Sequence, residues 1–268
     1  MKIITYIVIL LFTFQLYGSK IGDFKKKLNE KKSSSSHKSK SSNSDSDNDS
    51  DYSFSNYSGG SYNNNYYNNN DDFWFYFWWY LLFGNLNNSN SHYSHYPYEK
   101  QDIGLYDSKS NKKFTAQFTT NYFHSNQLKG IDFNLKLAGT AVGIRVDLST
   151  LWEKDDDGKN YNITFNNIFL NFYRIRESEV TMWWGLGAKA IDFDHTFAID
   201  LGLELFLFKP ISFYLDYSVG FYEDFIIQEL NTSLNIYSGR YYLKVGYHGH
   251  YIEGAFLSGP TIGVGAHF

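Results

Sequence analysis

Apolar and polar residues alternate with a period of two through almost all of residues 114–268. Successive side chains of a β-strand point to opposite faces, so this alternation predicts strands rather than helices. In the clearest run, residues 197–207, Phe, Ile and Leu fill the odd positions while Ala, Asp, Gly, Glu and Phe fill the even ones. About ten such runs follow one another, within a range of about eight to twelve, and turn residues separate them. The sequence therefore predicts an all-β fold.

The two faces of the expected strands differ in chemistry. One face is almost purely Leu, Ile, Val, Phe and Tyr, and the other carries Gly, Ser and charged residues. This division is typical of a transmembrane β-barrel, which has lipid outside and a polar interior. The connections after the second, fourth, sixth and eighth strands are short or marked by Pro or Gly, as on the periplasmic side of such barrels. We expect residues 113–268 to form a closed antiparallel transmembrane β-barrel.

One expected strand, residues 161–173, breaks the alternation. Ile163 and Phe165 lie on one parity, whereas Ile168, Leu170 and Phe172 lie on the other. A β-bulge at residues 166 and 167 would bring both groups onto the same face. We therefore expect a bulge there.

The last strand carries a second pattern. Apolar residues at steps of two lead to an aromatic final residue, at Ile262, Val264, Ala266 and Phe268. This resembles the terminal strand of bacterial outer-membrane β-barrel proteins. The resemblance implies an outer-membrane location, with outer-membrane lipid and the barrel-insertion machinery as partners. It leaves residues 20–111 unmatched and says nothing of oligomeric state.

Charged residues are expected on the inner face of the barrel. Their signs are nearly balanced, and a small barrel is filled by its own side chains, so a paired network is favoured over a selective pore. An open channel is the alternative. The expected interior charges are Asp132, Lys136, Arg145, Asp147, Lys189, Asp200, Glu204, Asp216, Glu229, Arg240 and Lys244.

The region before the barrel divides into three parts. Residues 1–19 combine a Lys with a short apolar run and small residues, which predicts an export signal peptide; a retained anchor is the alternative. Residues 20–72 are Lys-, Ser- and Asp-rich and then Asn- and Tyr-rich, so we expect a disordered tether. Residues 73–112 begin with the aromatic run FWFYFWWYLLF, which would either lie at a membrane interface or pack at the barrel mouth, and continue as a polar linker.

Composition excludes several classes of function. The chain has no Cys, which removes disulfides, thiol catalysis and Cys-based metal sites. Its net charge is -4, so nothing favours a nucleic-acid partner. We expect no cofactor and no metal.

Two groups of residues are candidates for chemistry. Asp192, Asp194 and His195 could activate water in the loop after the fifth strand, and they resemble the Asp/His pairing of omptin-type outer-membrane proteases. That family needs carboxylates from facing loops, which Asp155, Asp156 and Asp157 could supply only if the fold brings them close, and a solvated loop is the alternative reading. His248, His250 and Glu253 form the second group, suited to metal or acid–base work, with ordinary rim residues as the alternative.

The sequence thus predicts an outer-membrane β-barrel with a structural, adhesive or small-pore role. An outer-membrane hydrolase that uses rim Asp and His residues is a second hypothesis, and a soluble secreted β-protein is a third. Whether the protein is an enzyme is left open, with a non-enzymatic role favoured.

Overall fold

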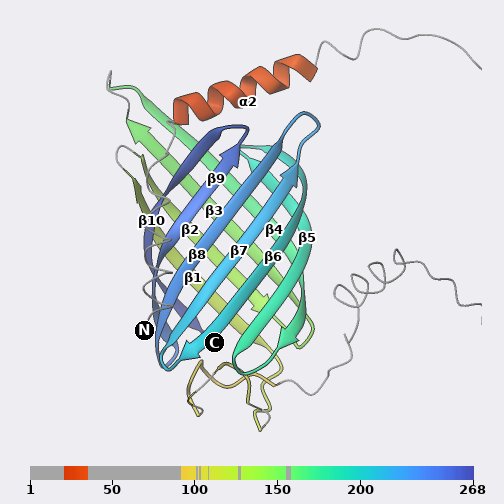
Figure 1. The fold of residues 1–268 in the computed structure, drawn as a ribbon, viewed down its shortest axis with the longest axis vertical. Coiled ribbons are helices and arrows are strands. Elements are labelled where there is room, and N and C mark those ends of the chain that lie inside the picture. Colours follow the sequence, from red (N-terminus) through yellow and green to blue (C-terminus); the bar gives the residue numbers. More distant parts are fainter. Residues whose placement is uncertain are drawn as a thin grey trace, which may run out of the picture.

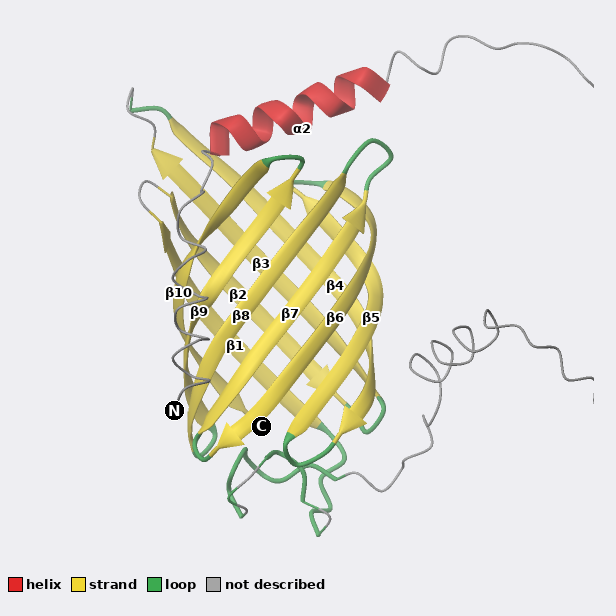
Figure 2. Ribbon diagram, in the orientation of Figure 1, coloured by secondary structure: helices red, strands yellow, loops and turns green. Residues whose placement is uncertain are grey.

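The computed structural model describes residues 21–35, 92–100, 102, 104–107, 109–125, 128–154 and 158–268. Ten strands form a closed antiparallel barrel, and one helix, α2 (Ile21–Ser35), lies across one end of it (Figures 1 and 2). The strands are β1 (Thr115–Ser125), β2 (Leu128–Ala138), β3 (Val142–Lys154), β4 (Asn160–Arg176), β5 (Val180–Ile191), β6 (Asp194–Phe208), β7 (Ile211–Phe221), β8 (Ile226–Ser238), β9 (Tyr241–Ile252) and β10 (Ala255–His267).

Each strand pairs with its neighbours in the sequence, and β1 pairs with β10 to close the barrel. Phe118, for example, is opposite Leu135 of β2 on one side and Ala266 of β10 on the other. This closure confirms the predicted all-β antiparallel barrel of about ten strands. It leaves no unpaired strand edge among the ten, which removes the usual site of edge-to-edge aggregation.

The expected bulge at residues 166 and 167 is wrong. The pairing of β3 with β4 runs without a break from Val142 opposite Phe172 to Lys154 opposite Asn160, and the irregularity between β4 and β5 falls at Tyr173 and Ile175. Ile163 and Phe165 lie on the inner face and are buried, like Asn167 further along the strand. The inner face of β4 changes from polar to apolar near one end because that end of the barrel is covered.

The cover at that end is α2, which differs from the tether expected from residue 20 onward. Ile21, Phe24 and Leu28 are buried, at spacings that place them on one helical face. They pack on inward-facing apolar residues at the ends of several strands, and we call this set the α2 cluster: Ile21, Phe24, Leu28, Phe123, Leu128, Leu151, Ile163, Phe165, Ile191, Phe225, Ile227, Ile252, Ala255 and Leu257. No helix in the described part of the chain is long and apolar enough to cross a membrane.

The opposite end of the barrel is covered by residues 92–113, in the part of the chain expected to be a polar linker. Loops gather at this end in Figure 2. Tyr93 and Tyr98 are buried, and they pack with aromatic residues on the inner faces of the strands. We call this set the tyrosine cluster: Tyr93, Tyr98, Leu105, Tyr106, Ala138, Tyr173, Trp183, Phe206, Tyr237 and Tyr242. The signal-peptide, tether and aromatic-run predictions for residues 1–20 and 36–91 fall outside the described residues.

Candidate functional site

The barrel interior between the two end clusters holds a dense set of buried charges. Arg145 of β3 is at its centre, with 1% of its surface exposed. Its guanidinium forms ion pairs with three carboxylates: Asp147 of β3 (Nε to Oδ2, 2.9 Å), Asp200 of β6 (Nη2 to Oδ1, 3.1 Å) and Asp216 of β7. Arg145 therefore links strands that lie on different sides of the barrel, and these four residues form the arginine cluster.

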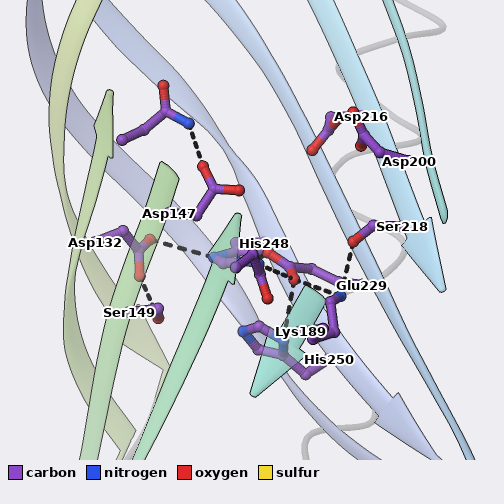
Figure 3. Close-up of polar contacts among 12 residues, drawn as sticks. Asp132, Asp147, Ser149, Lys189, Asp200, Asp216, Ser218, Glu229, His248 and His250 are labelled. Atoms are coloured by element: carbon purple, nitrogen blue, oxygen red, sulfur yellow. Dashed lines mark hydrogen bonds and ion pairs between the residues drawn. The ribbon is translucent and has the colours of Figure 1, made fainter. Parts of the chain in front are cut away.

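A second group, the histidine cluster, lies beside the arginine cluster in the barrel interior (Figure 3). It comprises Asp132 of β2, Lys189 of β5, Glu229 of β8, and His248 and His250 of β9. His248 bridges two carboxylates, with its Nδ1 3.2 Å from Asp132 Oδ2 and its Nε2 2.9 Å from Glu229 Oε1. Lys189 Nζ lies 2.7 Å from the other oxygen of Glu229 and donates to Ser218 at 2.7 Å. The cluster joins β2, β5, β7, β8 and β9.

His250 stands apart from this network. Its ring stacks on that of Phe165, with centroids 3.8 Å apart and planes 6° from parallel. It is 1% exposed, and neither ring nitrogen has a hydrogen-bond partner among the described residues. Its closest charged neighbour is Glu229, with Nδ1 3.9 Å from Oε2.

Toward the end of the barrel that residues 92–113 cover, polar and aromatic side chains contact one another. Lys136 lies over the indole of Trp183, 3.7 Å from its centroid, and Trp183 donates to Asp200 Oδ2 at 3.1 Å. A Cβ at Gly202 would overlap that indole, so the absence of a side chain there gives the ring its place. Glu204 accepts hydrogen bonds from Ser212 and Tyr237 at 2.7 and 2.8 Å. The buried charged side chains at this end are thus paired with oppositely charged groups, hydroxyl groups or aromatic rings.

The segment that covers this end is fixed by phenol groups. Tyr93 donates to Gly139 O and Tyr98 donates to Ile211 O, both at 2.7 Å. Burial raises the pKa of Tyr98 above its ordinary value, and the nearby Glu204 carboxylate raises it further. The phenol is therefore protonated at neutral pH and serves as a hydrogen-bond donor to the strand that follows the β6–β7 turn.

Little space is left inside. A cavity between the arginine and histidine clusters, lined by residues such as Asn134, Asp216 and His248, has a volume of about 30 Å³. That volume has room for only one or two water molecules. With α2 at one end and residues 92–113 at the other, the described barrel is packed rather than open.

Ten of the eleven residues predicted to line the interior lie inside the barrel. Asp132, Lys136, Arg145, Lys189, Asp200, Glu204, Asp216, Glu229 and Lys244 are buried, and the Asp147 side chain is 17% exposed. Arg240 is the exception: it lies in the β8–β9 turn, is exposed, and its guanidinium is 5.1 Å from the Tyr241 ring centroid. The prediction for Arg240 is wrong because the alternation does not extend to the residue before β9 begins.

The candidates at residues 192–195 are placed in the β5–β6 turn and at the start of β6. Asp192 has a positive φ of 54°, a conformation that Asp tolerates better than most residues. Its carboxylate accepts from Thr164 N at 3.1 Å and pairs with Lys25 of α2 at 3.1 Å. Asp194 and His195 are exposed. The contacts of Asp192 indicate a role in shaping the turn and holding α2, and residues 155–157 lie outside the described residues.

The second candidate group is divided by the structure. His248 and His250 face the interior and are buried, whereas Glu253 lies in the exposed β9–β10 turn, where its carbonyl oxygen accepts from Lys27 Nζ at 3.1 Å. Glu229 of β8, the strand that pairs with β9, lies beside the histidines, where Glu253 was expected to lie. Sequence alone could have found this residue only by aligning β8 with β9, because Glu229 pairs directly with His250 in that register.

The terminal-strand residues lie on the outer face of β10. Ile262, Val264 and Phe268 are more than half exposed, and the backbone of Phe268 exchanges hydrogen bonds of 2.8 and 3.0 Å with Ala116. Their side chains are thus available to an external partner.

No protein-family model matches the sequence, and no curated protein matches it.

Proposed function

We propose that the chain is a bacterial outer-membrane β-barrel whose sealed interior gives it a structural or adhesive role at the cell surface rather than a conducting one. The observation that carries the proposal is the pairing of an apolar outer surface with a charged, filled interior. Outward-facing apolar residues are 36–57% exposed on all ten strands, including Phe133, Leu148 and Val264. Soluble proteins rarely expose a continuous apolar surface of this extent, because its hydration is unfavourable.

The distribution of aromatic residues on that surface supports the same proposal. Most exposed aromatic residues lie near the two ends of the barrel, and the zone between them is mainly aliphatic apart from Phe118 and Phe133. Transmembrane barrels place such girdles at the two membrane interfaces. The residues near the α2 end are Tyr122, Trp152, Phe197, Phe221 and Tyr251, and those near the other end are Phe114, Phe208, Tyr241 and Phe268.

The filled interior favours a structural role over a small pore. The cavity of about 30 Å³ is far below what a hydrated ion requires, and each end is covered by a cluster of packed apolar side chains. Interior charge in this barrel links strands: Arg145 alone connects β3, β6 and β7. The expected export signal and the terminal strand pattern supply the route to the membrane.

The deciding experiment labels single Cys residues at alternate positions of β6 in protein reconstituted into vesicles. Cys at Leu201, Leu203 and Leu205 should react with a lipid-dissolved reagent and resist a water-soluble one. Cys at Ala198 and Glu204, which are buried on the inner face of β6, should resist the lipid-dissolved reagent. Labelling of 201, 203 and 205 by the water-soluble reagent, together with recovery of the native protein in culture medium, would support a soluble secreted protein instead.

A conductance measurement separates the structural role from a pore. Planar bilayers that contain the purified protein should show no steady ion current at neutral pH. A reproducible single-channel current that changes on substitution of Glu204 by Gln would contradict the sealed interior.

A further inference from the structure

His250 is unusual among the buried residues. Native interiors rarely leave a buried polar group without a partner, because its lost hydration is then uncompensated. Both ring nitrogens of His250 are in that state, and the ring lies beside Glu229 (Figure 3). An unpaired imidazole beside a carboxylate and a second imidazole indicates a ligand that the protein atoms do not include.

The fold places three metal-binding side chains together. Glu229 of β8 is directly opposite His250 of β9 in the strand register, and His248 lies two residues along on the same inner face. One ligand atom from each lies within 4.8 Å of the others. Two ligands of a single Zn²⁺ lie about 3.3 Å apart at ordinary bond lengths. His248 Nε2 lies 2.9 Å from Glu229 Oε1, and His250 Nδ1 lies 3.9 Å from Glu229 Oε2, so small side-chain movements would bring the three residues to that spacing.

The surroundings of His248 match a known feature of metal sites. A histidine that binds a metal through one nitrogen usually donates from the other to a carboxylate, which fixes the ring. Asp132 Oδ2 lies 3.2 Å from His248 Nδ1, so Nε2 is the nitrogen that faces Glu229. Ser149 in turn donates to Asp132 at 2.6 Å and holds that carboxylate.

Lys189 is the nearby cation that such a site must tolerate. It contacts only Oε2 of Glu229, whereas His248 contacts Oε1. Asn167 also donates to Oε2, at 3.0 Å, and its own Oδ1 is buried without a partner. Lys189 and Asn167 therefore orient the carboxylate from one side and leave the other oxygen for an ion.

We propose that Glu229, His248 and His250 bind one divalent transition-metal ion of the Zn²⁺ class inside the barrel. Two imidazoles and one carboxylate are a ligand set suited to Zn²⁺. A site closed on all sides holds a structural ion. The ion would tie β8 to β9, and it would be captured as the barrel closes. This inference holds whether the barrel resides in a membrane or in solution.

The test uses the full-length, untagged chain refolded in detergent with ZnCl₂ or with EDTA, followed by gel filtration and metal analysis. The Zn²⁺-refolded protein should retain about one Zn²⁺ per chain and unfold at a higher urea concentration than the EDTA-refolded protein. His250→Phe keeps the stacking on Phe165 but should lower the retained Zn²⁺ at least tenfold. His267→Phe, which alters a buried histidine at the other end of the barrel, and His195→Ala, which alters an exposed one, should retain Zn²⁺ as the wild type does.

Less than a tenth of an equivalent of Zn²⁺ in folded wild-type protein, or equal Zn²⁺ in wild type and folded His250→Phe, would overturn the proposal. A second measurement does not depend on any variant folding. Wild-type protein refolded with Co²⁺ should show the visible absorption bands of tetrahedral Co²⁺ with nitrogen and oxygen ligands. A folded barrel without those bands would also overturn it.

Discussion

Arg145 and Asp200 form an ion pair across the inside of the barrel, between strands β3 and β6 that are not neighbours, with Nη2 and Oδ1 3.1 Å apart. Asp200 is fully buried, and Arg145 is 1% exposed. Removing one member of a buried ion pair leaves the other charge without compensation, which costs far more than the loss of a surface pair. The centre of this barrel therefore depends on one guanidinium.

The first prediction follows from that dependence. Arg145→Met should lower the free energy of unfolding by about 3–5 kcal/mol, because Asp147, Asp200 and Asp216 would lose their shared cation. Urea unfolding in detergent or lipid measures the change. The matched control is Arg240→Met in the exposed β8–β9 turn, which should alter stability by less than about 0.5 kcal/mol. Equal effects at the two positions would show that the interior pairs contribute no stability.

The second prediction concerns the outer face. Leu203 lies in the middle of β6, between Met182 of β5 and Leu215 of β7. If it faces hydrocarbon, Leu203→Arg should destabilise the reconstituted protein by about 2–4 kcal/mol. The same substitution at Phe208, close to the end of the strand, should cost about 0–1 kcal/mol. A cost that does not depend on depth would argue against a membrane around the barrel.

The third prediction concerns α2. Phe24 is buried and meets the Phe165 ring edge-on, with centroids 6.0 Å apart. Phe24→Ala should weaken docking of the helix by about 3 kcal/mol, the low end for a buried Phe. Hydrogen exchange should then accelerate in residues 21–30 while the strand amides keep their protection. Lys26→Ala, on the exposed side of the helix, is the control and should leave exchange unchanged. Loss of protection throughout the barrel would make α2 part of the folding core instead.

The fourth prediction arises because α2 and residues 92–113 cover opposite ends of the barrel (Figure 1). In a membrane these ends would face different compartments, so the two covering segments would lie on opposite sides of it. We expect Lys26→Cys to react with a membrane-impermeant maleimide on intact cells, and Glu99→Cys to react only after the outer membrane is permeabilised. If both sites require permeabilisation, α2 does not cover the outward-facing end of the barrel in the inserted protein.

The fifth prediction separates folding from assembly at Phe268. Its backbone hydrogen bonds with Ala116 do not involve the side chain, which is 52% exposed on the outer face. Phe268→Ser should therefore refold in detergent nearly as well as wild type. In cells the same variant should fail to accumulate in the outer membrane, because the terminal pattern that we expect the insertion machinery to recognise is lost. Normal amounts of the variant in the outer membrane would exclude that recognition.

The strands and the facing of their residues can be predicted from the sequence, because side-chain direction along a strand has a period of two and is a local property. From Phe197 to Leu207 each residue has the side that its position predicts, and even Phe206, an aromatic residue among polar ones, lies inside. The same local rule predicts the wrong facing at Ile163 and Phe165, because apolar residues on the inner face look like a shift in the phase of the alternation. They are apolar because α2, more than a hundred residues earlier, covers them.

The side-chain contacts across the barrel interior could not be predicted from the sequence and are visible only in the tertiary structure. The ion pair between Arg145 and Asp200 and the approach of Asp132 to His248 depend on the tilt and stagger of ten strands, which no single strand encodes. Closure likewise brought Glu229, rather than Glu253, beside His250. The helical stripe of Ile21, Phe24 and Leu28 was hidden in a Lys- and Ser-rich region because three apolar residues cannot stabilise a helix alone. They do so here because the barrel end supplies the surface on which they pack.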